Sequence, residues 1–212
     1  MKYYPLFMDL AGRECLVVGA GTVAARKVRS LLACGAAVTV VGERPAAAFR
    51  ALERRGVRLR PRRFRASDVG GQALVIAATD DRSVNASVAA AARRRGIPVN
   101  AVDDPPNCTF IVPAVVRRGA LTVAVSTGGK SPAVARFVKE RIEALLGAEH
   151  AALVRLLGAH RERMKATVPG QSARAKAWKR MLNEGVLDSL RKRERVAATE
   201  TVRRCLKEAG RK

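Results

Sequence analysis

Two glycines and an alanine near the start of the chain have the spacing of a turn that could bind a dinucleotide. Gly19, Gly21 and Ala24 form the pattern G-x-G-x-x-A directly after the apolar run of residues 15–18. The first glycine permits a tight turn, the second lets backbone N–H groups approach a pyrophosphate, and Ala24 lets a helix pack close to the strand. The alternative is a turn that needs glycine for its geometry alone.

A carboxylate follows at the spacing that dinucleotide-binding domains use to hold a ribose. Glu43 comes after the second apolar run, residues 37–41, and about twenty residues beyond the glycines. A carboxylate there binds ribose hydroxyls and repels a 2′-phosphate, which favours NAD, whereas the adjacent Arg44 is able to accept such a phosphate. The sequence therefore predicts NAD and leaves NADP open.

Alternating strands and helices position these groups. Strands are expected over residues 15–18, 37–41, 57–60, 74–78 and 98–102, and helices over 22–33, 46–55 and 83–95. This alternation predicts a parallel sheet with helices on both faces, whose ligands lie beyond the carboxyl ends of the strands. The residues that follow such ends are Gly19, Glu43, Thr79 and Asp103.

The pattern changes after residue 110. Residues 110–116 and 121–126 predict a hairpin, and Ser131 with Pro132 predicts the start of a helix. Residues from 149 onward predict three or four amphipathic helices. The fold class is therefore α/β, with a Rossmann-type domain over 1–113, a small hairpin-helix domain over 114–147 and a helical domain over 148–212.

Two helices carry apolar residues on one face. The first helix is expected to turn inward Val23, Val28, Leu31 and Leu32. The helix after Pro132 carries on one face Val134, Val138, Ile142 and Leu145.

The chain of 212 residues has a formal net charge of +23. Three explanations are open: favoured codons of a GC-rich genome, attraction to nucleic acid or membranes, and attraction of a polyanionic small substrate. The four cysteines are scattered without a C-x-x-C, and there are only two histidines. This usage is typical of a reducing compartment and argues against a disulfide framework or a metal site. With no signal-peptide pattern and no membrane-spanning run, we expect a cytoplasmic protein.

Five motifs occur together and in order. They are residues 17–27, residues 77–81 with Asn85, residues 100–103, residues 110–113 and residues 124–132. In this combination the chain resembles the precorrin-2 dehydrogenase/sirohydrochlorin ferrochelatase family, the N-terminal module of sirohaem synthase. The resemblance implies a Rossmann domain, a dimerisation domain, a helical domain and a homodimer. We expect the methyltransferase module of full-length sirohaem synthase to be absent.

The resemblance also implies an activity and its residues. NAD would oxidise precorrin-2 to sirohydrochlorin, and in many members of the family the same site then inserts ferrous iron. The family's catalytic aspartate maps to Asp103, although Asp103 and Asp104 could also be turn formers before a proline. The dinucleotide would lie on Gly19, Gly21, Thr22 and Val23 at the pyrophosphate, on Glu43 and Arg44, and on Thr79 beside the nicotinamide.

A second loop is a candidate for the substrate. Thr127, Lys130 and Ser131 precede a helix N-terminus and could bind the acetate and propionate groups of a tetrapyrrole. The alternative is a helix cap and nothing more. Some members of the family carry a phosphorylated serine where Thr127 stands here. A rival to the enzyme is a regulatory module that binds NAD and contacts nucleic acid through its basic tail; against it, no helix-turn-helix is evident.

Overall fold

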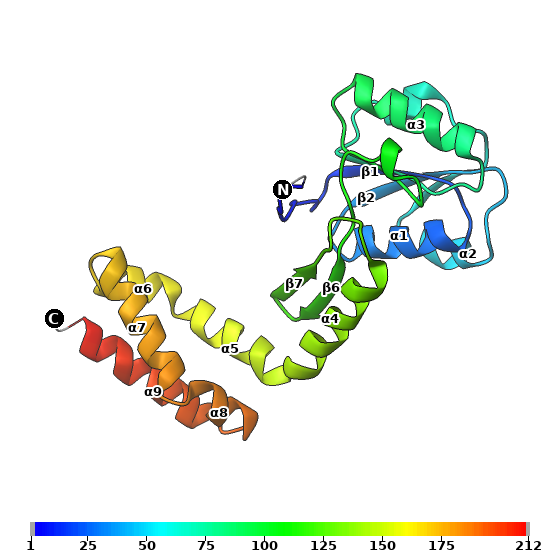
Figure 1. Ribbon diagram of the computed structural model, residues 1–212. Coiled ribbons are helices and arrows are strands. Elements are labelled where there is room, and N and C mark those ends of the chain that lie inside the picture. Colours follow the sequence, from blue (N-terminus) through cyan, green and yellow to red (C-terminus); the bar gives the residue numbers. More distant parts are fainter. Residues whose placement is uncertain (1–2, 211–212) are drawn as a thin grey trace. The chain divides into compact units, whose positions relative to one another are not determined.

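The structure, a computed structural model, describes residues 3–210. The chain forms two compact units, Met1–Val112 and Pro113–Lys212. Figure 1 shows a sheet with helices in the first unit and a hairpin followed by helices in the second. The α/β fold class is confirmed. The division of the second unit into a dimerisation domain and a helical domain stays a prediction.

The first unit is built on a parallel five-stranded sheet with the order β3-β2-β1-β4-β5. Successive strands are joined by helical or irregular crossovers, as the alternation predicted. The strands are β1 (Glu14–Val18), β2 (Ala37–Val41), β3 (Arg58–Arg60), β4 (Leu74–Ala77) and β5 (Val99–Ala101).

Helices cover both faces of this sheet, as Figure 1 shows. Cys15 and Val17 of β1 pack in one buried cluster with the helices α1 and α2, whereas Leu16 and Val18 pack on the other face with α3. Adjacent side chains of a strand point to opposite faces, so β1 must be apolar throughout. The helical segments are α1 (Thr22–Leu32), α2 (Ala48–Glu53) and α3 (Arg82–Arg94), with short 3-10 turns at η1 (Ala66–Val69) and η2 (Pro105–Asn107).

The predicted inward face of α1 is wrong at Val23. The buried residues of α1 are Ala24, Ala25, Val28 and Leu31, and Val23 is exposed. Small side chains at the start of the helix let it approach the sheet closely, and this leaves Val23 at the edge of the sheet.

The hairpin consists of β6 (Ala114–Arg118) and β7 (Leu121–Val125), paired from Ala114 opposite Val125. The prediction that its first strand begins at residue 110 is wrong. Proline at position 113 has no N–H for a ladder, and β7 offers no paired residue beyond Val125. The strands are followed by α4 (Pro132–Leu145), which packs on them.

Five helices follow α4 in the described part of the chain, where three or four were expected. Gly170 and Gly185, both with positive φ, separate them into short segments. Their shared core contains Met164, Met181 and Val202. The helices are α5 (Ala148–Ala159), α6 (Arg161–Thr167), α7 (Gln171–Asn183), α8 (Val186–Arg191) and α9 (Arg195–Ala209). Across residues 3–210, none of the helices has the length and apolar character needed to cross a membrane.

Candidate functional site

The turn between β1 and α1 accepts only glycine at its first position. Gly19 has a φ of +112°, and a Cβ built there would lie 2.2 Å from the carbonyl oxygen of Ala78. Because Ala78 follows β4, the turn packs directly on the end of the neighbouring strand. Close backbone packing at the carboxyl edge of the sheet therefore requires this glycine, in addition to the geometry of the turn.

The N-terminus of α1 is open. Its N-cap is Gly21, and no side chain of the described residues caps it. A Cβ at Gly21 would meet no atom within 4 Å, and both Thr22 and Val23 are exposed. Free N–H groups and the positive end of the helix dipole attract phosphate. The arrangement fits the pyrophosphate of a dinucleotide.

A further glycine holds the end of β2 against this turn. A Cβ on Gly42 would lie 2.8 Å from the Cβ of Ala20 and 2.9 Å from its nitrogen. Glu43, the next residue, is thereby fixed beside the glycine turn. Our reading of the sequence missed Gly42; its place between a buried strand and a candidate ribose carboxylate is the signal that could have found it.

Glu43 and Arg44 both lie exposed beyond β2. The Nε of Arg63 donates a hydrogen bond of 3.1 Å to Oε1 of Glu43. Arg63 comes from the segment after β3, so a second arginine joins Arg44 near the expected ribose position. Both groups of the ion pair are largely exposed, and the pair is therefore weak.

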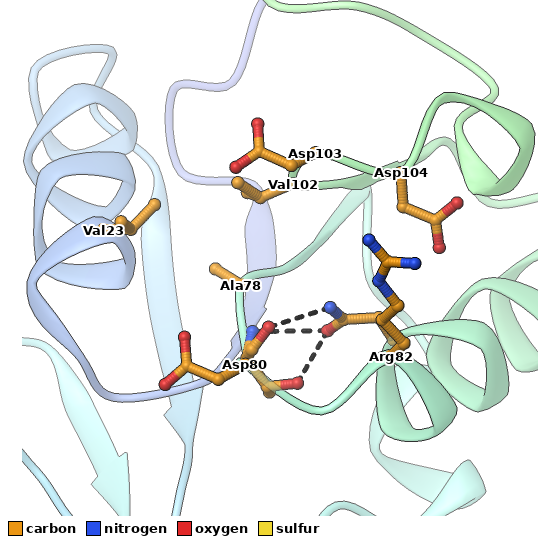
Figure 2. Close-up of a pocket in the computed structure, with 9 residues that line it drawn as sticks. Val23, Ala78, Asp80, Arg82, Val102, Asp103 and Asp104 are labelled. Carbon is orange, nitrogen blue, oxygen red and sulfur yellow. Dashed lines mark hydrogen bonds between the residues drawn. The ribbon is translucent and has the colours of Figure 1, made fainter.

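A cavity of about 210 Å³ lies at the carboxyl edge of the sheet (Figure 2). It brings together three predicted site residues, Val23 from α1, Thr79 after β4 and Asp103 after β5. The other lining residues are Ala78, Asp80, Arg82, Asn85, Val102 and Asp104. Residues far apart in the sequence thus meet where ligands of such sheets bind.

Asn85 holds Thr79 in place. The buried Asn85 side chain accepts hydrogen bonds from the Thr79 backbone N–H at 3.2 Å and from its hydroxyl at 2.8 Å. Its Nδ2 donates to the Thr79 carbonyl at 2.9 Å. The backbone of Thr79 is therefore rigid at the cavity wall. Asn85 belongs to the motif that suggested the family, but no role was predicted for it.

Asp103 and its neighbour Asp104 differ in what their carboxylates contact. Oδ2 of Asp104 accepts a hydrogen bond of 2.8 Å from Nδ2 of Asn107, which closes the η2 turn. In residues 3–210 the structure gives the exposed Asp103 carboxylate no hydrogen bond or ion pair. Figure 2 shows Asp103 turned toward the α1 side of the cavity and Asp104 turned toward Arg82. Of these two neighbours, Asp103 is the one whose carboxylate is free to act on a ligand.

The backbone at Asp103 is strained. Its φ is +57°, and Asp103 and Arg193 are the two non-glycine residues with positive φ in the described chain. Asp and Asn adopt this region more easily than other residues with a Cβ. The turn-former alternative therefore accounts for the residue type, and the free carboxylate in a cavity is what favours a chemical role.

The charge of the cavity lining is negative. Asp80, Asp103 and Asp104 face one guanidinium, that of Arg82. This balance does not match the basic cleft that the polyanionic-substrate explanation would place here. It does suit a cation, and the oxidised nicotinamide ring carries a positive charge. Asp80 and Arg82 were not predicted; Asp80 lies in the loop after β4, and Arg82 is the first residue of α3.

Lys27 lies one turn beyond Val23 on α1, within electrostatic range of Asp103. Burial lowers the pKa of its ammonium, with the same effect from Arg26, and the Asp103 carboxylate opposes this change. Lys27 is thus a cation held on the same side of α1 as the cavity.

The predicted substrate residues belong to the second unit and form a loop of their own. The Thr127 hydroxyl accepts a hydrogen bond from the Ser131 N–H and donates to the Ser131 carbonyl, both at 3.0 Å. The Ser131 hydroxyl caps α4 by accepting from the Val134 N–H at 3.3 Å. Thr127 and Ser131 therefore shape the loop, and the exposed Lys130 is the member with a free charged group.

A second cavity, of about 590 Å³, lies among the helices of the second unit, and none of the predicted site residues lines it. Its charged lining residues are Glu149, Arg155, Arg191, Arg193 and Arg195. Over residues 3–210 the structure contains no group of three or more His, Cys, Asp and Glu residues arranged to hold a metal ion.

Two protein families match the chain in successive segments. The family described as putative NAD(P)-binding matches residues 6–114, just over half of the chain, and the one described as sirohaem biosynthesis protein central matches residues 118–145. The chain belongs to the NAD(P)-binding family. This membership confirms the class of cofactor that the glycine turn and Glu43 predicted.

Curated relatives support the same assignment. The chain is 49% identical over 183 residues to the siroheme synthase of Methylococcus capsulatus, covering 86% of this chain and 39% of the relative. It is 41% identical over 207 residues to that of Thioalkalivibrio sulfidiphilus, covering 97% and 42%. The chain thus spans about two-fifths of the length of these relatives.

A solved structure gives a match over the whole fold. SirC, a precorrin-2 dehydrogenase, has a TM-score of 0.76 and 26% identity, with 97% of this chain and 100% of SirC covered. The predicted kinship with precorrin-2 dehydrogenases and sirohaem synthase is therefore confirmed. The alternative of a regulatory module is not favoured, because the relatives and the solved structure that match this chain carry the names of enzymes.

Proposed function

We propose that the protein oxidises precorrin-2 to sirohydrochlorin with NAD. The observation that carries this proposal is the cavity at the carboxyl edge of the sheet, where Asp103 stands free beside the open N-terminus of α1. The kinship with SirC, a precorrin-2 dehydrogenase of similar fold, supports the choice of substrate.

Several of the predicted residues have a task in this reaction. The backbone N–H groups at Gly21, Thr22 and Val23 bind the pyrophosphate, and Glu43 binds the ribose hydroxyls. Bound NAD supplies the hydride acceptor. Asp103 takes the proton that the macrocycle loses with the hydride, because a carboxylate in hydrogen-bond reach can act as a general base. Asn85 keeps the Thr79 backbone fixed at the cavity wall.

Substrate binding needs more positive charge than Arg82 alone supplies to the cavity lining. Precorrin-2 carries acetate and propionate groups, and the loop with Lys130 offers an exposed ammonium at a helix N-terminus. Thr127 and Ser131 shape this loop. The excess of 41 Lys and Arg over 18 Asp and Glu residues raises the encounter rate of a polyanion with the protein as a whole.

The test is NADH formation from precorrin-2 under anaerobic conditions, compared between the native chain and Asp103→Asn. Asparagine tolerates the positive φ of this position, so the variant should keep its melting temperature and NAD affinity. Its kcat should fall about 10²-fold or more. Absence of NADH above background in the native protein would overturn the oxidation, and normal turnover by the variant would overturn the role of Asp103.

We also propose a homodimer formed through the second unit. The face of α4 that carries Val134, Phe137 and Leu145 is exposed, and β6 and β7 form a two-stranded sheet with free edges. Exposed apolar surface and unpaired strand edges favour association. The scattered positions of the four cysteines, without a C-x-x-C, suit the cytoplasm, where we place the protein.

Iron insertion into sirohydrochlorin is a second candidate activity. The observation in its favour is the negative cavity, where Asp80 and Asp103 would attract ferrous ion and Asp103 would accept the pyrrole protons. The measurement is iron-dependent loss of the sirohydrochlorin spectrum without NAD. A rate equal to that of a protein-free control would leave the chain a dehydrogenase only.

A further inference from the structure

The residues around Asp103 form a short closed excursion from the sheet. The chain leaves β5 after Ala101 and returns at Thr109, whose backbone N–H donates a hydrogen bond of 2.8 Å to the Val99 carbonyl. The Thr109 hydroxyl accepts a hydrogen bond from the Val99 N–H, also at 2.8 Å. Residues 102–108 are thus tied at their base, with Asp103 near the start of the loop.

The Cys108 thiol fills the inside of this loop. Its sulfur accepts a hydrogen bond from the Ala101 N–H at 3.2 Å, and Nδ2 of the buried Asn100 approaches it at 3.5 Å. The thiol donates to the carbonyl of Ala101 at 3.1 Å or that of Asp104 at 3.3 Å. Cys108 therefore contacts the backbone on both sides of Asp103.

The protonation state of the Cys108 thiol allows it both to donate and to accept a hydrogen bond. Burial raises the pKa of Cys108, with a further increase from Asp104, against the hydrogen bond from the Ala101 backbone. The group therefore stays protonated at neutral pH and is able to donate as well as accept. Cys108 does not line the cavity, so its route to the chemistry runs through Asp103.

Asp103 needs such support. Its positive φ is unfavourable for a residue with a Cβ, and no hydrogen bond or ion pair holds its carboxylate within residues 3–210. A free side chain on a strained backbone keeps its direction only if the residues before and after it are fixed. Ala101 is fixed by the sheet and by Cys108, and Asp104 is fixed by Asn107 and by Cys108.

We propose that Cys108 is a positioning residue for Asp103. Its thiol bridges the backbone of Ala101 and Asp104 and so holds the strained turn that aims the Asp103 carboxylate into the cavity. This inference rests on the proposed function, in which Asp103 is the base. Loss of the thiol leaves NAD binding intact, because the pyrophosphate and ribose groups belong to the turns after β1 and β2.

The experiment compares Cys108→Ala, Cys108→Ser and a matched control, Cys15→Ala. Cys15 is a fully buried cysteine of β1 in the same unit, and its sulfur makes no hydrogen bond in the described structure. The control removes the same atom without touching the loop. The readouts are kcat, KM for precorrin-2, NAD affinity and the melting temperature.

Cys108→Ala should lower kcat about tenfold, equivalent to about 1.4 kcal/mol of barrier, with KM and NAD affinity within twofold of the native values. Cys108→Ser should recover most of the loss, since a hydroxyl makes the same two kinds of hydrogen bond. Cys15→Ala should lower the melting temperature and keep kcat. A native kcat in Cys108→Ala, or a serine variant as slow as the alanine variant, would overturn the proposal.

Amide hydrogen exchange over residues 101–108 tests the same inference without turnover. Exchange should become more than tenfold faster in Cys108→Ala, but not in Cys108→Ser or Cys15→Ala. If the native protein formed no NADH while exchange still changed in this way, the proposed function would fail and the bridge would stand. Unchanged exchange in Cys108→Ala would refute the bridge.

Discussion

The sheet of the first unit and the hairpin with α4 of the second are built from similar residues but bury them differently. Residues 15–18 of β1 are all buried, whereas the hairpin buries only Val116 fully and α4 buries only Ala135. On α4, Val134, Phe137 and Leu145 are 50%, 57% and 75% exposed. An apolar pattern therefore shows that a face needs burial, but not which chain buries it.

The difference follows from the number of layers. The parallel sheet has helices on both faces, so its two clusters of buried side chains are completed within one unit. The hairpin is contacted by α4 and by α5, and a two-stranded sheet with these helices is too small to bury all the apolar side chains of α4. The first region buries its apolar side chains within its own elements, whereas the second leaves those of the α4 face exposed.

Gly19→Ala should have the largest effect on the self-contained region. The added Cβ would meet the Ala78 backbone at 2.2 Å and the φ of +112° would be strained, so the first unit should lose about 3 kcal/mol or more. Gly21→Ala is the matched control: its Cβ meets nothing within 4 Å, so folding should persist while NAD affinity falls. Melting temperature and NAD titration measure the two effects. Equal melting temperatures for both variants would contradict the packing argument.

Phe137→Asp should have the second-largest effect, and it acts on the region formed by the hairpin and α4. A charge on the exposed α4 face would have to be buried in the dimer, which should weaken association at least tenfold and leave the monomer folded. Val196→Asp on α9 is the control, since Val196 is 72% exposed but lies away from the hairpin in the sequence and outside α4. Light scattering over a micromolar range gives the result. If the native chain is already monomeric at micromolar concentration, the proposed dimer is contradicted.

The sequence predicted features that local patterns determine and missed those that depend on contacts between distant segments. The strand ends at Gly19, Glu43, Thr79 and Asp103 could be read from local patterns, because a parallel sheet places every carboxyl end at one edge. The packing of Gly42 on Ala20 and the exposure of Val23 were missed, since each depends on contact between segments that are distant in the chain. For Gly42, its place between a buried strand and Glu43 is the one local signal. The start of β6 was predicted too early. The residues before Ala114 are apolar like a strand, but no strand lies opposite them to pair with.

The contacts that fix the cavity were missed for a related reason. Asn85 and Cys108 act on backbone atoms six and seven residues away, Thr79 and Ala101, and no periodic pattern marks such a bond. A polar residue in an apolar helix, as with Asn85 in α3, is the one local signal. The catalytic proposal for Asp103 came from the family resemblance, and its placement came from the structure.

A third prediction concerns acid and the helical core, which resembles the sheet in being closed on itself. Hydrogen bonds from Arg180, Arg204 and Cys205 lower the pKa of Glu184 to about 2. Because the pKa is lower in the folded state, the stabilisation is full above the unfolded value near 4.5 and is lost as the pH falls toward 2. Glu184→Gln should lower the melting temperature by a few degrees at pH 7.

The difference between native and variant chains should shrink steadily between pH 4.5 and pH 2, which thermal scans across that range would measure. The effect is modest because the Arg180 and Arg204 side chains are 50% and 59% exposed, and exposed ion pairs are screened by water. Glu162→Gln is the comparison: Lys165 also lowers the pKa of Glu162, but the Glu162 side chain is far more exposed than that of Glu184, so its gap should follow the same pH course and be smaller. A gap that stays constant with pH would show that the charge of Glu184 does not contribute.

The smallest effect is expected where the first unit meets its cofactor. Arg63 pairs with Glu43 at 3.1 Å, and both side chains are well exposed, so Arg63→Ala should change the melting temperature by less than about a degree. Removing this cation should weaken NADP about threefold and leave NAD unchanged or slightly tighter, since Glu43 is then free for the ribose hydroxyls.

Titration of both dinucleotides at low and high salt would measure this shift, with Arg95→Ala as the control. Arg95 is an exposed arginine at the C-terminal end of α3. Because α3 leads the chain back to the start of β5, Arg95 lies at the amino ends of the strands, whereas Glu43 lies at their carboxyl ends. The change in selectivity should fade at high salt, where the Debye length falls to a few ångströms. An equal loss of NAD and NADP affinity in Arg63→Ala would mean that Arg63 orients Glu43 for the ribose instead of competing for it, and would place Arg63 among the residues that favour NAD.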